Sequence, residues 1–133
     1  MSVLNHITLT VRDLDLSEAF YTNHFGLRCR ARGPAQVYLD APGLWLCLER
    51  SDTPSPATDG THIAFTATDA EFAARAEGLK EAAKPWKDNR SEGASLYVCD
   101  PDGHRLELHV GDLESRLAHY RAHPEKGVEV LDP

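Results

Sequence analysis

Three residues far apart in the chain supply two imidazoles and a carboxylate, the side chains that commonly bind divalent metals. His6 begins the segment HITLTV, His62 begins the similar segment HIAFTA, and Glu107 lies on a later apolar segment. Two histidines and one carboxylate leave coordination positions open for water or substrate. A single histidine at the start of a strand is more often a surface residue, but here the position is repeated. We therefore predict a metal centre at His6, His62 and Glu107, provided that the fold brings them together.

The segment KPWKDNRSEGASLYV (84–98) is a second candidate site, because it is basic and polar in an acidic chain. Lys84, Lys87 and Arg90 fall within seven residues, whereas the whole chain has a formal net charge of −7. Small polar residues and a glycine alternate in the same segment: Asn89, Ser91, Gly93 and Ser95. Such a segment can surround a cation with oxygen ligands or direct positive charge at an anion. Composition alone favours a third interpretation, an exposed loop with incidental charge.

Two sequence matches in the same order indicate a duplicated module that would position these residues. The His-Ile segments are 56 residues apart, and GLWLCLE (43–49) matches GHRLELH (103–109) at a distance of 60 residues. Cys47 is then the counterpart of Glu107, and Trp45, two residues earlier, faces the same side of its strand. If the two modules pack with pseudo-twofold symmetry, equivalent strands meet at the centre and the three predicted ligands converge.

Local patterns predict the helices of each module. Asp15 and Glu18 resemble a capping pair before the first helix, and Gly26 is placed to end it. Asp69 is placed to cap the second helix, and a last helix is expected from Asp112 to about His123. The apolar face of the first helix is Leu16, Ala19, Phe20 and Phe25, and that of the second is Phe72, Ala76, Leu79 and Ala83.

The strands complete an α+β fold. They are expected near residues 4–11, 27–31, 36–40, 44–49, 61–67, 95–99 and 104–110. We therefore predict a single domain over residues 1–133. It consists of two pseudo-symmetric βαβββ modules, about 1–50 and 60–111, and a C-terminal helix and tail, about 112–133.

Composition excludes several classes of protein. The 133 residues suit one domain with a real core, at 41% hydrophobic and 26% charged residues. A sequence pI near 5.4 argues against nucleic acid as the main partner. We find neither an apolar run of membrane-spanning length nor a signal-peptide core. Three cysteines without C-x-x-C spacing suggest reduced thiols, and so a cytoplasmic location.

The block WKDNRSEGASLYVCDPDGHRLELHVGDLESRL (86–117), with LNHITLTV and LWLCLE, closely resembles the fosfomycin-resistance thiol transferases that use glutathione. These enzymes are members of the vicinal oxygen chelate superfamily, which pairs βαβββ modules. The resemblance implies an enzyme that opens the epoxide of the antibiotic fosfomycin by attack of a thiolate. It implies a Mn(II)-type centre at His6, His62 and Glu107, a bound K⁺ ion, and glutathione as co-substrate. It also implies a homodimer in which His6 can reach across to the partner's site.

The resemblance further implies roles for residues around this centre. Thr8 would hydrogen-bond the oxirane side of the substrate, and Trp45, which its two-residue spacing from Cys47 already places on that side, would face the same cavity. The phosphonate would be held by Lys87, Ser91, Tyr97 and Arg116, with Arg90 close by. The K⁺ ion would lie among Asn89, Ser91, Gly93 and Ser95. Tyr38 and Arg90 would contact the thiol.

Some positions differ from the pattern of these relatives and leave the thiol open. No aromatic residue lies near Gly33, Glu49 replaces a small polar residue, and Gly60 replaces a tyrosine. Relatives that hydrate fosfomycin use a glutamate where Gln36 stands here, which weakens the hydrolase alternative without removing it. Other enzymes of the same scaffold, such as lyase-isomerases and extradiol dioxygenases, and a non-catalytic drug-binding protein are the remaining alternatives.

Overall fold

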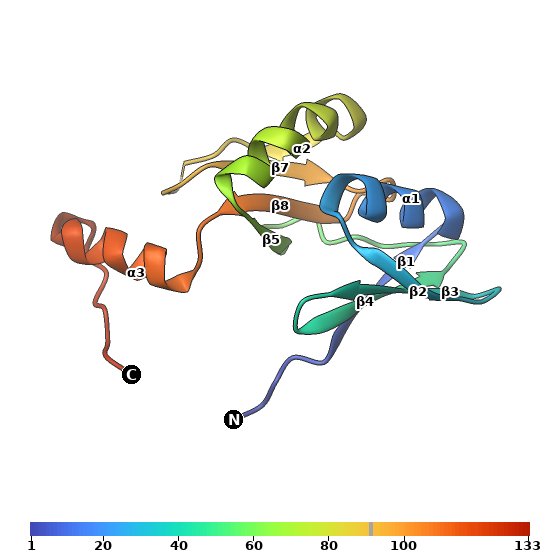
Figure 1. Cartoon of the computed structure of the whole chain (residues 1–133), viewed down its shortest axis with the longest axis horizontal. Coiled ribbons are helices and arrows are strands. Elements are labelled where there is room, and N and C mark those ends of the chain that lie inside the picture. The colour runs from blue at the N-terminus through green and yellow to red at the C-terminus, as the bar shows by residue number, and fades with distance from the viewer. Residues whose placement is uncertain (91) are drawn as a thin grey trace.

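The computed structural model describes residues 1–90 and 92–133 and consists of two modules with the same order of elements (Figure 1). The first module contains β1 (His6–Val11), α1 (Leu14–Phe25), β2 (Arg28–Arg32), β3 (Gln36–Ala41) and β4 (Leu44–Arg50). Its four-stranded sheet has the order β1-β4-β3-β2, with β1 parallel to β4 and the other pairs antiparallel.

The second module repeats this arrangement. It contains β5 (Ile63–Ala67), α2 (Asp69–Ala82), β6 (Pro85–Lys87), β7 (Ser95–Cys99) and β8 (Arg105–Val110). The sheet order β5-β8-β7-β6 matches that of the first module, and β5 is parallel to β8. The α+β class and the paired βαβββ modules are therefore confirmed. The short strand β6 was not among the expected strands, because a proline and three residues of pairing carry little sequence pattern.

Strand register supports the duplication at the level of single residues. Ile7 pairs with Leu46 in the first module, and the equivalent residues Ile63 and Leu106 pair in the second. The next pairs are Thr8 with Cys47 and Ala64 with Glu107. Leu46 and Leu106 are both buried, so the pairs that face the core are the same in the two modules. The next pairs, which lie on the opposite face of each sheet, differ between the modules. The alignment of Cys47 with Glu107 therefore holds in the structure.

Two helix caps differ from the sequence-based expectation. The first helix is capped by Asp13, whose side chain accepts a hydrogen bond from the backbone of Leu16, and Asp15 lies inside the first turn. The second is capped by Thr68, which forms a capping box with Glu71. In both helices the capping residue lies one or two positions before the predicted acid, and its side chain accepts from a free backbone N–H group. The predicted acid lies in the first turn, where its negative charge interacts favourably with the positive end of the helix dipole.

Other helix boundaries agree with the prediction. Gly26 ends α1 with a φ of 70°, a left-handed conformation that favours glycine. Asp112 caps α3 (Leu113–Ala122) and forms a capping box with Ser115. The first strand is shorter than expected and begins at His6 rather than at residue 4.

One buried cluster contains side chains from both modules. Leu46 and Leu48 of β4 and Leu106 and Leu108 of β8 are at most 2% exposed. Across the modules, the rings of Phe25 and Phe65 lie 4.6 Å apart. A hydrogen bond also joins the modules, because the hydroxyl of Tyr21 donates to Oδ2 of Asp100 at 2.7 Å.

The Tyr21→Phe variant is expected to lose about 1–3 kcal/mol of unfolding free energy, because the buried Asp100 carboxylate loses a donor. Burial raises the pKa of Asp100, and the Tyr21 hydrogen bond opposes this rise. A carboxyl whose folded-state pKa is raised stabilises the fold less as pH rises through that pKa. The loss of unfolding free energy in Tyr21→Phe should therefore increase as pH rises through the pKa of Asp100.

Urea unfolding at several pH values measures this loss, with Tyr38→Phe, at an exposed site, as the matched control. Equal stability of Tyr21→Phe and wild type would contradict the expectation.

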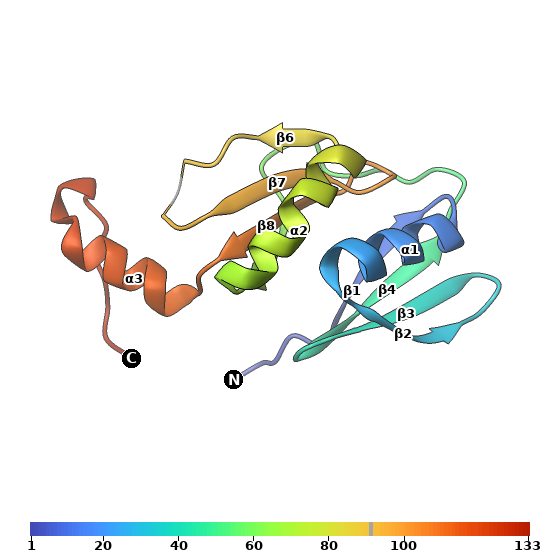
Figure 2. The ribbon, with the colours of Figure 1, turned by 45° about the horizontal axis from the view of Figure 1, so that its top comes forward.

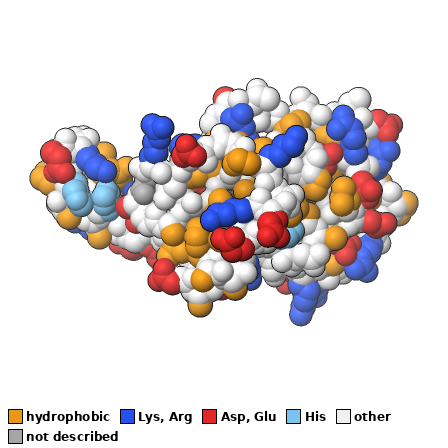
Figure 3. Space-filling model, turned by 90° about the horizontal axis from the view of Figure 1, so that it is seen from above, with side chains coloured by type: hydrophobic (Ala, Val, Ile, Leu, Met, Phe, Trp, Pro, Cys, Tyr) orange, Lys and Arg blue, Asp and Glu red, His pale blue; other side chains and the backbone are white. Residues whose placement is uncertain are grey.

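The C-terminal helix α3 projects away from the two modules (Figures 1 and 2), and the space-filling view shows the same arm (Figure 3). None of its residues is buried, and its packing is mainly against the following 3-10 helix η1 (Pro124–Lys126). Leu113 at the start of α3 is 68% exposed, and Leu131 in the tail is 72% exposed. Within residues 1–90 and 92–133, no helix is both long and apolar enough to cross a membrane.

Candidate metal centre

The structure brings two of the three predicted metal ligands into contact. Nε2 of His62 lies 3.0 Å from Oε1 of Glu107. Glu107 lies in the middle of β8, and His62 immediately precedes the neighbouring parallel strand β5. Nδ1 of His62 lies 2.7 Å from the carbonyl oxygen of Gly60 and donates to it, which fixes the orientation of the ring.

The donor set fits a divalent cation. With Nδ1 donating to a carbonyl, neutral His62 directs the unshared pair of Nε2 at a carboxylate oxygen of Glu107. Two acceptors that face each other repel unless they share a cation or a proton. One imidazole nitrogen and one carboxylate oxygen are ligands that Mn(II) and related ions accept.

A second oxygen of Glu107 is held from the other side. Oγ of Ser95 donates to Oε2 of Glu107 at 2.6 Å, and Nδ1 of His109 lies 2.6 Å from the same hydroxyl. The Glu107 side chain is only 8% exposed. This buried, hydrogen-bonded setting orients the carboxylate toward His62.

An aromatic and cationic wall lies beside the pair. Lys87, Tyr97 and Glu107 are cross-strand neighbours on β6, β7 and β8. Nζ of Lys87 lies 5.1 Å from the centre of the Tyr97 ring. The ring of Trp86 lies 5.2 Å from the His62 ring, and its indole N–H donates to the carbonyl oxygen of Leu106. The wall therefore combines a positive charge and a phenol next to the predicted ligands.

The loop between β6 and β7 is held against the end of β8. Nδ2 of Asn89 donates to the carbonyl oxygen of Gly93 at 2.9 Å. Gly93 has a φ of 74°, and a Cβ at this position would collide with the carbonyl of Val110. Arg90 is exposed, and Ser91 lies outside the described residues.

Arg116 of α3 is connected to this loop by a hydrogen bond. Its Nε donates to Oε1 of Glu92 at 3.0 Å. This bond lowers the pKa of the Glu92 carboxyl, which therefore remains charged at neutral pH. Nε2 of His109 lies 3.4 Å from the same carboxylate oxygen. Neither His109 nor Glu92 was among the predicted site residues, since neither belongs to a motif of its own.

The remaining predicted residues lie on the outward face of the first module. The ring of His6 stacks on Trp45 at 4.6 Å, and its Nδ1 lies 2.6 Å from Oδ1 of Asn5. Thr8 lies on the same strand face as His6, and the Tyr38 ring lies 6.4 Å from that of Trp45. Within the described part of one chain, no group of three His, Cys, Asp or Glu residues is placed to hold a metal. His6 is thus not brought to His62 and Glu107 inside a single chain.

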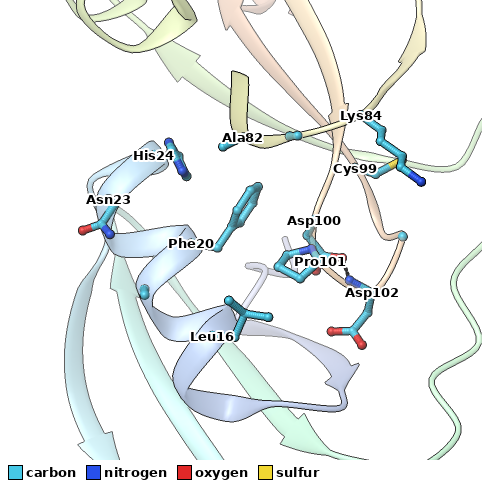
Figure 4. Close-up of a pocket in the computed structure, with 13 residues that line it drawn as sticks. Leu16, Phe20, Asn23, His24, Ala82, Lys84, Cys99, Asp100, Pro101 and Asp102 are labelled. Carbon is cyan, nitrogen blue, oxygen red and sulfur yellow. Dashed lines mark hydrogen bonds between the residues drawn. The ribbon is translucent and has the colours of Figure 1, made fainter. Parts of the chain in front are cut away.

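In the part of the chain that the structure describes, two cavities are lined by residues of both modules. One, of about 670 Å³, is bounded by Ile7 and Leu46 on one side and by the segment 62–66, including His62, on the other. The other, of about 730 Å³, lies between α1 and the β7–β8 turn (Figure 4). Figure 4 shows that its walls include Phe20 and Cys99, whose thiol pKa is raised by burial. Among the described residues, none of the predicted metal or phosphonate ligands lines this larger cavity, whereas His62 lines the smaller one, so we assign the chemistry to the His62 side.

Comparisons with known proteins agree with this architecture. The family model described as "Glyoxalase/Bleomycin resistance protein/Dioxygenase superfamily" matches residues 3–108 of the chain. The chain is 45% identical over 130 residues to the glutathione transferase FosA of Serratia marcescens, covering 94% of this chain and 92% of that protein. It is 38% identical over 125 residues to the metallothiol transferase FosB of Lysinibacillus sphaericus, covering 89% of each.

A solved structure shows the same fold. A variant of the fosfomycin resistance protein FosX from Listeria monocytogenes, complexed with Mn(II) and 1S,2S-dihydroxypropylphosphonic acid, superposes with a TM-score of 0.75. It is 36% identical, and the match covers 90% of this chain and 98% of that one. The chain therefore belongs to the glyoxalase/bleomycin resistance protein/dioxygenase superfamily and, within it, to the group that contains the FosA, FosB and FosX proteins.

Proposed function

We propose that this protein is a Mn(II)-dependent glutathione transferase that adds glutathione to the epoxide of fosfomycin and so confers resistance to this antibiotic. The observation that carries the proposal is the His62–Glu107 pair, with Lys87 and Tyr97 next to it on the same face. A metal ligand pair and a phosphonate-binding wall are the two features that this substrate requires. The similarity to the FosA of Serratia marcescens supports glutathione as the thiol.

The chemistry follows from these side chains. Held by His62, Glu107 and a third ligand, Mn(II) would stabilise the negative charge that develops on the epoxide oxygen. Lys87, Tyr97 and Arg116 would bind the phosphonate dianion by charge-assisted hydrogen bonds and orient the substrate. The thiolate sulfur then bonds to an epoxide carbon as the carbon–oxygen bond breaks, and the freed oxygen takes a proton. Thr8, which shares a strand face with His6, would hydrogen-bond that oxygen.

A homodimer would supply the third ligand, and we propose that His6 comes from the partner subunit. The strands β1 and β5 are both sheet edges, and unpaired edges need cover. The arm formed by α3 buries none of its residues within one chain, and exposed Val3 and Leu4 precede His6. A symmetric dimer could cover these surfaces and place His6 and Thr8 of one protomer beside His62 and Glu107 of the other.

The thiol would lie on the face that carries Tyr38 and Trp45, whose rings are neighbours. Tyr38 is 41% exposed, so it is open to a tripeptide ligand, and Arg90 offers a charge to a glutathione carboxylate. Glutathione is the main intracellular thiol, and the three cysteines of the chain are free thiols. Both points support a cytoplasmic enzyme.

A hydrolase is the second candidate, because Glu49 presents an exposed carboxylate opposite Gln36 on adjacent strands. A carboxylate near the epoxide could activate water instead of a thiol. Product analysis after incubation with fosfomycin, Mn(II) and glutathione distinguishes the candidates. A glutathione adduct supports the transferase, a diol supports the hydrolase, and tight binding without turnover supports a drug-binding protein.

K⁺ is expected to raise the rate more than Na⁺ at fixed ionic strength, mainly by lowering the KM for fosfomycin. We propose that oxygens of Asn89, Ser91, Gly93 and Ser95 coordinate the ion. A bound monovalent cation would add positive charge near the phosphonate without another basic side chain. Ser91→Ala should reduce the activation, and Lys87→Ala should weaken phosphonate binding whether or not K⁺ is present.

Steady-state kinetics in K⁺, Na⁺ and tetramethylammonium buffers measure this effect. Lys80→Ala, a change on the exposed face of α2, is the matched control for Lys87 and should respond to K⁺ as wild type does. Equal rates in all three buffers would show that the loop holds no functional cation.

A further inference from the structure

Four contacts link Arg116, on the C-terminal arm, to the predicted metal ligand Glu107. Nε of Arg116 donates to Oε1 of Glu92 at 3.0 Å, and Nε2 of His109 lies 3.4 Å from the same oxygen. Nδ1 of His109 lies 2.6 Å from Oγ of Ser95, which lies 2.6 Å from Oε2 of Glu107. The contacts therefore run from α3 through the β6–β7 loop and across β8 and β7 to the carboxylate that faces His62.

The hydrogen atoms give this chain a direction. A serine hydroxyl has one hydrogen, and in Ser95 it is donated to Glu107. The hydrogen between His109 and Ser95 must then come from Nδ1 of His109. The other ring nitrogen, Nε2, lies 3.4 Å from Oε1 of Glu92, and this contact is attractive when Nε2 also carries a hydrogen. Each contact thus constrains the next, and a rotation of the His109 ring would disturb both carboxylates.

Burial distinguishes this network from the ion pairs on the surface. The side chains of Glu92 and His109 are 14% and 12% exposed. By contrast, Arg30 and Asp40, which also form an ion pair, are 59% and 49% exposed. Exposed pairs contribute little, whereas a half-buried carboxylate such as Glu92 is less screened by water, and its removal leaves its partners without an acceptor. Glu92 therefore does more than balance charge at the surface.

We propose that Glu92 is a positioning residue that orients two functional groups at once. It holds the guanidinium of Arg116 directly, and it holds Glu107 through His109 and Ser95. Because Glu92 engages Nε, the planar guanidinium keeps other N–H groups for a phosphonate. The role of Arg116 rests on the proposed function, whereas the link to Glu107 requires only that Glu107 binds a metal.

The test uses the full-length protein and four variants. Glu92→Ala is expected to raise the KM for fosfomycin about tenfold, with a smaller change in kcat, and to lower Mn(II) affinity by about tenfold. Glu92→Gln keeps an oxygen acceptor for Arg116 and should recover most of the KM. His109→Phe should lower Mn(II) affinity about tenfold or more, with a smaller effect on KM. Glu114→Gln, an exposed acid on the first turn of α3, is the matched control and should behave as wild type.

Calorimetry with Mn(II) alone, steady-state kinetics and thermal unfolding separate the outcomes. A residue of purely structural importance would lower Tm and leave KM and Mn(II) affinity unchanged, which would overturn the proposal. If the wild-type protein binds Mn(II) but does not turn fosfomycin over, the proposed function fails and the positioning of Glu107 is judged by Mn(II) affinity. Reduced affinity in both Glu92→Ala and His109→Phe then supports it, and wild-type affinity in both overturns it.

Discussion

His62→Ala and Glu107→Ala are each expected to abolish turnover of fosfomycin and to lower Mn(II) affinity by at least about a hundredfold. The reason is geometric, since Nε2 of His62 and Oε1 of Glu107 lie 3.0 Å apart and are the two groups that would share the ion. Loss of a group that only orients a ligand typically costs about ten- to a hundredfold in metal affinity, so loss of the ligand itself should cost at least as much.

Titration calorimetry with Mn(II) measures this effect. His24→Ala, which removes a histidine of α1 outside the centre, is the control and should keep the affinity of wild type. Glu107→Gln is a sharper variant, because it preserves an acceptor for Ser95 while removing the negative charge. If both alanine variants bind Mn(II) as tightly as wild type, the metal centre has been assigned to the wrong residues.

Mixing inactive His6→Ala protein with inactive Glu107→Ala protein is expected to restore activity. If His6 crosses to the partner subunit, each mixed dimer contains one intact site and one that lacks two ligands. Random exchange makes half of the dimers mixed, so activity should recover to about a quarter of the wild-type value. The separation of His6 from His62 and Glu107 within one chain motivates this expectation.

Subunit exchange has to be demonstrated independently, for example by mass spectrometry of differently labelled chains. A mixture of His62→Ala and Glu107→Ala proteins is the matched control and should stay inactive, because these two ligands belong to the same chain in every site. Inactivity of the His6→Ala and Glu107→Ala mixture, despite complete exchange, would mean that each site takes all its ligands from one chain.

The sequence predicted those features that repeat. Two matched segments were sufficient to infer equivalent strands, and the pairing of Ile7 with Leu46 and of Ile63 with Leu106 agrees with that inference. Apolar periodicity predicts such strands because buried faces impose it. The predicted helix caps were one or two residues too late, since each helix start offers more than one side chain that could accept from the same N–H groups: two acids at the first helix, and a threonine and two acids at the second.

Contacts without periodicity could not be predicted in this way. The approach of His109 to Glu92 depends on the course of a loop and on how it meets the end of β8. The contact of Trp86 with His62 depends on β6, whose three residues have no distinctive pattern. The distance of His6 from the other two ligands depends on how whole modules pack, which the pattern within each module leaves undetermined.

The shared strand register has a consequence for how such proteins change their chemistry over evolutionary time. The core-facing pairs of the two modules are the same, Ile7–Leu46 and Ile63–Leu106. The adjacent pairs on the opposite face have diverged, since Thr8–Cys47 in one module corresponds to Ala64–Glu107 in the other. Heritable variation can thus accumulate at outward positions while the selection for a stable interior is still met. A duplicated ancestor would have had two equal faces, one free to keep an inherited activity while the other acquired a new one. This independence offers a physical basis for the range of reactions found on one scaffold.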